Sequence, residues 1–192
     1  MDKAQEIIEF WVNEVGPKGW YQGGEHLDQT IRDRFLDDWE QARAGAYDSW
    51  GCCPDKSLAL IILLDQFPRN MFRGDPRSFA TDKKAREVAK VAIDKNWDQK
   101  VAEPARQFFF LPYMHSECLT HQERCVRLVM TRMPETGGEN LIHAKVHREI
   151  IRQFGRFPYR NDALGRKTTD AEKRFIEDGG YQAILKDLQE PA

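Results

Sequence analysis

The sequence predicts an all-α protein built from antiparallel helical hairpins. Apolar residues recur at three- and four-residue spacing in nearly every segment of the 192-residue chain. No segment alternates apolar and polar residues as a half-buried strand does. Glycine, proline and capping residues divide the pattern into about eight helices. The length is that of one domain, so we expect residues 1–192 to form a single all-α domain.

Two helices are expected before residue 46. An apolar stripe from Ala4 to Val15 predicts the first, which Gly16-Pro17 should end. A glycine-rich loop then runs to Gly24. Asp28 can cap the second helix, and Gly45 is its expected end.

Residues Ser57 to Phe67, SLALIILLDQF, form the most apolar segment. A buried strand and a buried helix are both compatible with so short a run. Leucine and alanine content favours the helix, as does the lack of a companion strand. Such a helix is apolar almost all round and should lie at the centre of the core, with Leu60 and Leu63 or Leu64 fully buried.

The remaining helices are predicted from caps and stripes. Their starting signals are Thr81-Asp82, Glu103-Pro104, a capping box of Thr120 and Glu123, the stripe Ile142 to Phe154, and a capping box of Thr169 and Glu172 before the last helix.

Two short blocks resemble each other. QFPRN occupies residues 66–70 and RFPYRN occupies residues 156–161. Each follows an apolar helix that proline is expected to interrupt, and each ends in an Arg-Asn pair. We call them the first and second Arg-Asn blocks. They could be quasi-equivalent parts of one site, or they could match by chance.

Arginines are concentrated around both blocks. Between residues 148 and 167 there are six basic residues against two acidic ones. Because a guanidinium group matches a carboxylate or phosphate in a bidentate manner, a pocket lined by these side chains would suit a small anion. The alternative is that they form internal braces with Asp65, Glu117 and Glu149. The predicted ligand-binding residues are Arg69, Asn70, Arg73, Arg156, Arg160 and Asn161.

Histidines supply the candidate proton carriers. His115 lies just past Pro112 and two residues before Glu117, so the pair could act as acid and base near neutral pH. His147 is the second candidate carrier, with Glu117 or Asp65 to orient either ring. The alternative is a hydrogen-bonded, half-buried histidine with no catalytic role.

A metal site is the weaker interpretation of the histidines. His143 and His147 are four residues apart and share a helix face, as in zinc-binding helices. The zincin pattern requires glutamate directly after the first histidine, and this chain has Ala144 there. We therefore predict no tightly bound metal and no cofactor.

Five segments, taken in order, resemble a bacterial family known as domain of unknown function 924. They are LALIILLDQFPRNMFRG, SFATD, LPYMHSE, HREIIRQFGRFPYRN and LGR. The resemblance runs from EFW in the first helix to FIEDGGY near the C-terminus. It implies a tetratricopeptide-like, right-handed helical array and no established activity. The family's motif positions fall on Asp65, Gln66, Phe67, Pro68, Arg69, Asn70, Arg73, His115, Glu117, His147, Arg148, Phe154, Gly155, Arg156, Phe157, Pro158, Arg160 and Asn161. Cys118 stands where the family pattern has an acidic residue, which leaves Glu117 as the carboxylate of that turn.

Composition limits the partners. The net charge of −2 argues against general binding to nucleic acid, and the lack of a long uncharged apolar run argues against a membrane span. Four cysteines without a C-x-x-C pair, and no visible secretory signal, favour reduced thiols in a cytoplasm. The leading interpretation is therefore a cytoplasmic protein with an Arg/His/Asn-lined pocket that binds a small anionic metabolite. If the protein is an enzyme, we expect hydrolase-like acid–base chemistry in that pocket. The alternative is a non-catalytic module that binds a peptide carboxylate.

Overall fold

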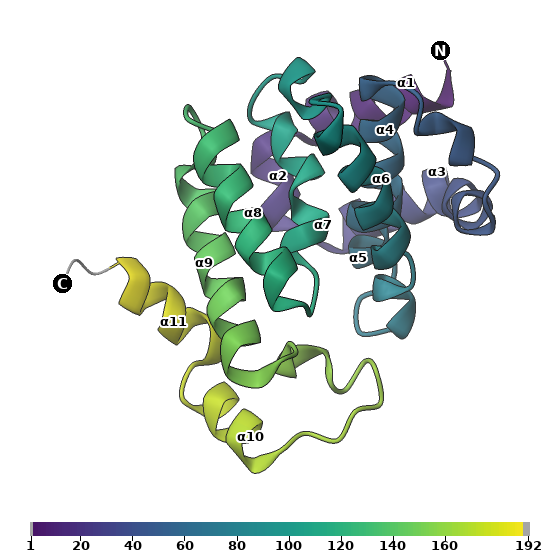
Figure 1. The fold of residues 1–192 in the computed structure, drawn as a ribbon. Helices are drawn as coiled ribbons and strands as arrows, with labels where there is room; N and C mark the ends of the chain where they lie inside the picture. The colour runs from purple at the N-terminus through teal and green to yellow at the C-terminus, as the bar shows by residue number, and fades with distance from the viewer. Residues whose placement is uncertain (1, 190–192) are drawn as a thin grey trace. The chain divides into compact units, whose positions relative to one another are not determined.

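The computed structural model describes residues 2–189, in which helices account for the regular structure and no strand occurs (Figure 1). The predicted all-α class is thus confirmed for the described chain. The chain divides into two compact units, Met1–Pro112 and Tyr113–Ala192. The single domain expected from the length stays a prediction.

The first unit is built around a central helical segment that changes its pitch. Its elements are α1 (Lys3–Ile8), the π-helix η1 (Glu9–Val15), α2 (Gly16–Gln22), α3 (Glu25–Ala44), the 3-10 helix η2 (Asp48–Trp50), α4 (Pro54–Ile61), the π-helix η3 (Ile62–Gln66), α5 (Phe67–Met71), the 3-10 helix η4 (Pro76–Phe79), α6 (Asp82–Asp94), and the 3-10 helices η5 (Asp98–Lys100) and η6 (Ala105–Phe109).

The second unit is an arrangement of helices around α9. Helix α7 (Leu111–Met114) leads into it, followed by α8 (Leu119–Arg132), α9 (Gly137–Phe154), the 3-10 helix η7 (Pro158–Arg160), α10 (Asp170–Glu177) and α11 (Gly180–Gln189). Helices α8 and α11 both pack against α9, which Figure 1 shows between them. The core of this unit contains Val146, Ile150, Ile151 and Phe157.

The segment from Leu58 to Leu64 is the centre of the first unit, as predicted. Leu60, Leu63 and Leu64 are each 0% exposed. Helices α1 and α6 both pack against α4, and α3 packs against the adjoining η3 and α5. A helix contacted from several sides must be apolar all round, which explains the composition of this segment.

Pro68 does not end this central helix, contrary to the sequence prediction. The helix continues through η3 and α5 to Met71, with Pro68 near the start of α5. Proline has no N–H to donate to the carbonyl four residues earlier, that of Leu64. The Thr81 hydroxyl donates a hydrogen bond to that carbonyl at 2.6 Å. The lost helical bond is replaced from outside the helix, so the chain need not turn away.

The second Arg-Asn block follows a different kind of helix end. Helix α9 ends at Phe154, and Gly155 adopts a left-handed conformation at φ 67°. Glycine tolerates this conformation because it has no Cβ atom. The helix has therefore ended before Pro158, and proline does not interrupt it as the sequence predicted.

Two further helix starts differ from the prediction. Helix α3 begins after Gly24 rather than at Asp28, whose buried side chain accepts hydrogen bonds from Arg73. The expected loop before it contains α2. Helix α8 follows Cys118 with no side-chain cap, so the capping box expected of Thr120 is absent there.

The capping box of Thr169 and Glu172 is confirmed at the start of α10. This helix is not the last described one, because α11 follows a turn at Gly179-Gly180. Helix α11 was missed although Tyr181, Ile184 and Leu185 have helical spacing.

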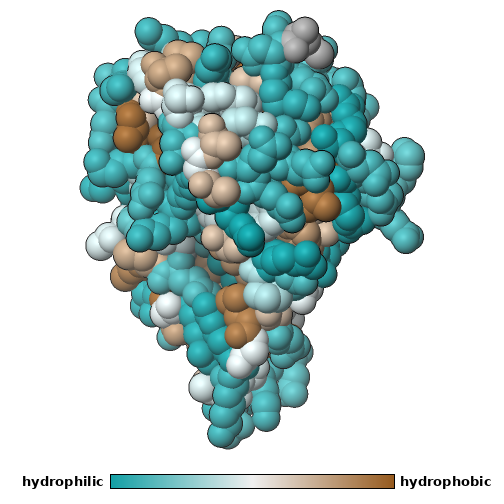
Figure 2. All heavy atoms as spheres, turned by 90° about the vertical axis from the view of Figure 1, so that its right-hand side faces the viewer, coloured by the Kyte–Doolittle hydropathy of each residue, from teal (hydrophilic) through white to brown (hydrophobic). Residues whose placement is uncertain are grey.

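No helix in residues 2–189 has the length and apolar character needed to cross a membrane. The face drawn in Figure 2 is mostly hydrophilic, and its hydrophobic side chains lie in small separate patches. Such scattered patches are ordinary for a protein surface.

Candidate functional site

The first Arg-Asn block lies in the first unit, where its side chains are hydrogen-bonded to nearby carboxylates and carbonyls. Arg69 forms ion pairs with Asp82 at 3.0 Å and with Asp65 at 3.4 Å. It also donates to the backbone carbonyl of Asp65. Asn70 donates to the Gln66 carbonyl. These bonds support carbonyls next to the change of helical pitch.

Arg73 makes a bidentate contact with the buried carboxylate of Asp28 and also donates to Asn70 Oδ1 at 2.9 Å. The hydrogen bonds that Arg73 donates to Asp28 raise the pKa of Arg73. The contact joins α3 to the turn after α5 across 45 residues of sequence. In the first unit, the geometry therefore favours the brace interpretation for Arg73.

Arg156, from the second block, also forms a brace. It contacts both carboxylate oxygens of Glu172 at 2.6 and 2.8 Å. Asn161 donates to the same carboxylate at 3.3 Å. These bonds tie the segment after α9 to the first turn of α10.

Glu117, in the turn between α7 and α8, is held by two different donors. Arg166 binds both of its oxygens at 2.9 and 2.8 Å, and the Phe157 N–H donates to it at 2.9 Å. Burial alone would raise the pKa of Glu117, but these hydrogen bonds outweigh that effect and hold the pKa below its ordinary value. Glu117 is therefore a carboxylate at neutral pH.

The turn that carries His115 and Glu117 is fixed by Gln122. This fully buried amide donates to the carbonyls of Tyr113, Met114 and Ser116. A single side chain from α8 thus binds carbonyls at the end of α7 and in the turn that follows it. Gln122 was not predicted as a site residue, because its role depends on contacts that the spacing does not reveal.

His147 lies on α9, with its ring among aromatic neighbours. Its Nδ1 atom is 2.8 Å from the backbone carbonyl of His143. The ring is edge-to-face with Phe157 at 5.4 Å and with Tyr181 at 5.3 Å between centroids. Burial lowers the pKa of His147 to about 3, helped by the charges of His115 and Arg160. His147 is therefore neutral at pH 7.

His115 and Arg160 complete this group. The rings of His115 and His147 are 6.5 Å apart. The buried Arg160 guanidinium lies over the Phe157 ring, 4.5 Å from its centroid, and its charge lowers the pKa of both His147 and Glu117. We call His115, Glu117, His147, Arg160 and Arg166 the histidine–arginine cluster. Four of these were predicted site residues; Arg166 was missed, although it lies in the LGR motif.

The cluster is better suited to binding than to proton transfer by His147. A general acid or base works best when its pKa is near the operating pH, whereas a pKa of about 3 leaves His147 a weak base at pH 7. Its neutral ring can still accept or donate a hydrogen bond. The catalytic roles proposed for His115, Glu117, His147 and Asp65 remain predictions.

The His143 and His147 pair is engaged in hydrogen bonding. His143 Nδ1 is 2.5 Å from the Tyr181 hydroxyl. Over residues 2–189, no group of three or more His, Cys, Asp or Glu side chains is arranged to hold a metal ion. The absence of a tightly bound metal from the purified protein stays a prediction.

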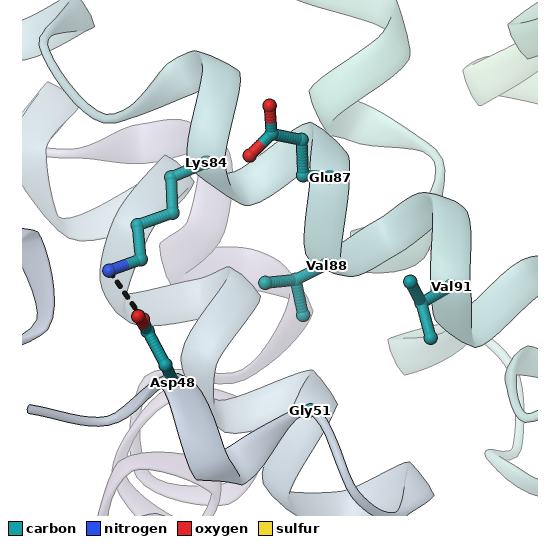
Figure 3. Close-up of a pocket in the computed structure, with 6 residues that line it drawn as sticks. All are labelled: Asp48, Gly51, Lys84, Glu87, Val88 and Val91. Carbon is teal, nitrogen blue, oxygen red and sulfur yellow. Dashed lines mark ion pairs between the residues drawn. The ribbon is translucent and has the colours of Figure 1, made fainter. Parts of the chain in front are cut away.

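The first unit also contains a pocket of about 320 Å³ beside η2 and α6 (Figure 3). It is lined by Asp48, Gly51, Lys84, Glu87, Val88 and Val91. Lys84 is bound to Asp48 at 2.6 Å and to the Ala42 carbonyl. The lining includes no predicted site residue. One Arg-Asn block lies in each unit, and the cavity predicted to join the blocks remains a prediction.

Comparisons with known proteins give a family but no activity. A family model described as "Bacterial protein of unknown function (DUF924)" matches residues 7–180. A solved structure of a protein of unknown function from Agrobacterium tumefaciens is 42% identical and superposes with a TM-score of 0.86. The match covers 92% of this chain and 97% of that one. No curated protein matches this chain significantly.

Proposed function

The chain belongs to the bacterial family DUF924, whose description assigns no function, and we propose from its own geometry that it binds a small anion at the histidine–arginine cluster. The carrying observation is that Phe157 brings three of these groups together: the buried Arg160 guanidinium lies over its ring, the His147 ring contacts it edge-to-face, and its backbone N–H donates to Glu117. Arg166, which engages the Glu117 carboxylate, supplies the second guanidinium group of the cluster. Carboxylate and phosphate groups are the partners that guanidinium recognises best.

The partly buried setting supports binding rather than simple charge balance. Hydrogen bonds and ion pairs strengthen where water is excluded, so a bound anion would gain more here than at an exposed arginine. The turn that carries Glu117 is fixed by Gln122, and Arg160 is packed on Phe157. A site held in this way loses little conformational freedom when a ligand binds.

The test is ligand-dependent stabilisation of the whole protein. Phosphate and malate should each raise the melting temperature beyond a sodium chloride control of matched ionic strength, because a ligand that binds only the folded state stabilises it. Arg160→Gln keeps part of the aliphatic stem but removes the guanidinium group and its charge, and it should abolish this increment. Arg152→Gln is the matched control, since Arg152 is an exposed arginine of α9 paired with Glu149.

The increment is measured within each variant, so a change in basal melting temperature does not affect the conclusion. An increment that survives in Arg160→Gln, or that disappears equally in Arg152→Gln, would contradict binding at this cluster. A protein with no increment for either anion would contradict the proposal as a whole.

We also propose that the helices form a tetratricopeptide-like array and that the protein is cytoplasmic. The short connection between α8 and α9 and the packing of α11 on α9 support helical pairs in the second unit. The four cysteines, all among the described residues, are not joined in disulfides, which is typical of a reducing compartment. A peptide C-terminus is the second candidate ligand, because a helical array can present a carboxylate-binding arginine to it. A short peptide with a free carboxylate should then bind, and its amidated form should not.

A further inference from the structure

The hydrogen bonding of His147 restricts which anions suit the cluster. A backbone carbonyl can only accept, so the 2.8 Å contact with the His143 carbonyl makes Nδ1 of His147 the donor. A neutral imidazole carries one N–H, which leaves Nε2 with a lone pair. The neutral His147 ring, with its proton on Nδ1, therefore presents Nε2 as a hydrogen-bond acceptor.

Two elements besides α9 hold this ring in place. Phe157 contacts it from the segment after α9, and Tyr181 contacts it from α11, both edge-to-face. Tyr181 is itself fixed by the 2.5 Å contact between its hydroxyl and Nδ1 of His143. Since burial raises the pKa of Tyr181 to about 12, the phenol keeps its proton and can donate it there. Contacts from these two segments, together with the hydrogen bond to the His143 carbonyl, therefore fix the orientation of the His147 ring.

A cation and an acceptor thus lie around a single aromatic ring. Phe157 is contacted by the guanidinium group of Arg160, at 4.5 Å, and by the ring of His147, at 5.4 Å. An anionic oxygen suits Arg160 but not Nε2, because two acceptors do not form a hydrogen bond. A hydroxyl group on the same ligand can supply the missing proton donor.

We propose that the ligand carries a hydroxyl beside its anionic group and donates it to Nε2 of His147. The ligand class is a hydroxy acid or a protonated phosphate group. This inference rests on the proposed anion binding and adds the chemical class of the ligand. Sites that hydrogen-bond a ligand hydroxyl discriminate strongly against an analogue that lacks it, because the protein group is then left unpaired.

Two matched ligand pairs test this on the unaltered protein by calorimetry at pH 7. Malate and succinate differ by one hydroxyl, and hydrogen phosphate and sulfate differ in whether the bound anion carries a proton. We expect malate to bind at least tenfold more tightly than succinate, and phosphate at least tenfold more tightly than sulfate. A preference within only the first pair would identify a hydroxy acid, and a preference within only the second would identify a phosphate group.

The variant His147→Phe keeps an aromatic ring but removes the acceptor. It should bring malate down to the affinity of succinate and leave succinate unchanged, while His26→Phe, an exposed position in α3, should retain the preference. Equal affinities within both pairs in the unaltered protein would overturn the hydroxyl inference while leaving anion binding intact. Failure of all four anions to bind would overturn the proposed function first. Because the ligand pairs need no variant, the test stands even if His147→Phe does not fold.

Discussion

Thr81 donates its hydroxyl hydrogen bond to the carbonyl of Leu64, to which Pro68, four residues later, has no N–H to donate. The same hydroxyl oxygen accepts from Trp39 Nε1 at 3.1 Å. All of these groups are buried. One side chain thus satisfies two groups that belong to different helices, and it does so from the N-cap position of α6, where its hydroxyl makes no capping bond.

Replacing Thr81 with valine should therefore destabilise the protein by about 1–3 kcal/mol, since valine matches the shape but leaves a buried carbonyl and a buried indole N–H unpaired. Urea denaturation would measure the loss. The control is Thr131→Val, because Thr131 is exposed and bonds only to the carbonyl of Arg127 within α8. That change should cost no more than about 0.5 kcal/mol, and equal losses at the two positions would contradict the role assigned to Thr81.

Truncating Leu63 to alanine should cost about 2–5 kcal/mol, because its side chain is fully buried and the helices packed around it limit collapse of the cavity. Leu188→Ala in α11 is the comparison, since that side chain is 44% exposed. Thermal or urea unfolding of both variants provides the measurement. A loss below about 1 kcal/mol at Leu63 would show that this segment is not the centre of the core.

Acid should weaken the brace between Arg156 and Glu172. The hydrogen bond from Arg156, followed by those from Thr169 and Asn161, lowers the pKa of Glu172 from 4.5 to about 2. A carboxyl with a depressed folded-state pKa contributes stability that is present above the unfolded value and is lost as the pH falls toward the folded value. The difference in unfolding free energy between the wild type and Glu172→Gln should thus be constant above pH 5 and shrink between about pH 4.5 and pH 2. Parallel stability curves for the two proteins over that range would rule out this linkage.

Local signals predicted the fold well where a helix end is decided by neighbouring residues. The capping box of Thr169 and Glu172 and the stop at Gly45 both depend on contacts within a few residues. Asp28 carries an equally good local signal, but its carboxylate is engaged by Arg73, 45 residues away. Pro68 is a helix breaker by local rules, and its exception depends on Thr81. Such tertiary partners cannot be inferred from spacing alone.

The candidate site was predicted by residue type better than by pairing. His115 and His147 were singled out and their rings lie 6.5 Å apart, although 32 residues of sequence separate them. The sequence did not reveal that Arg166, rather than a member of either block, would bind Glu117. Nor did it reveal Tyr181, because α11 was not predicted. Arginine-rich composition indicates that ion pairs will form, whereas the assignment of partners depends on the fold.

His147 should remain neutral far below the pH at which an ordinary histidine gains its proton. Burial lowers its pKa from 6.5 to about 3. In an NMR titration, the Cε1–H resonance of His147, assigned by its absence from His147→Gln, should therefore not shift between pH 8 and pH 5. A midpoint near 6.5 would show that the ring is solvated, and the assignment of Nε2 as a fixed acceptor would then fail with it.

The same depressed pKa has a consequence for stability. As the pH falls below 6.5, the unfolded chain takes up a proton at His147 while the folded chain does not. The contribution of His147 to stability is thus complete above pH 6.5 and declines as the pH falls toward 3. The glutamine of His147→Gln does not titrate, so the wild type should lose stability relative to this variant across that interval in urea denaturation at a series of pH values. A difference that stays constant from pH 7 to pH 4 would contradict a neutral, buried His147, whatever the basal stability of the variant.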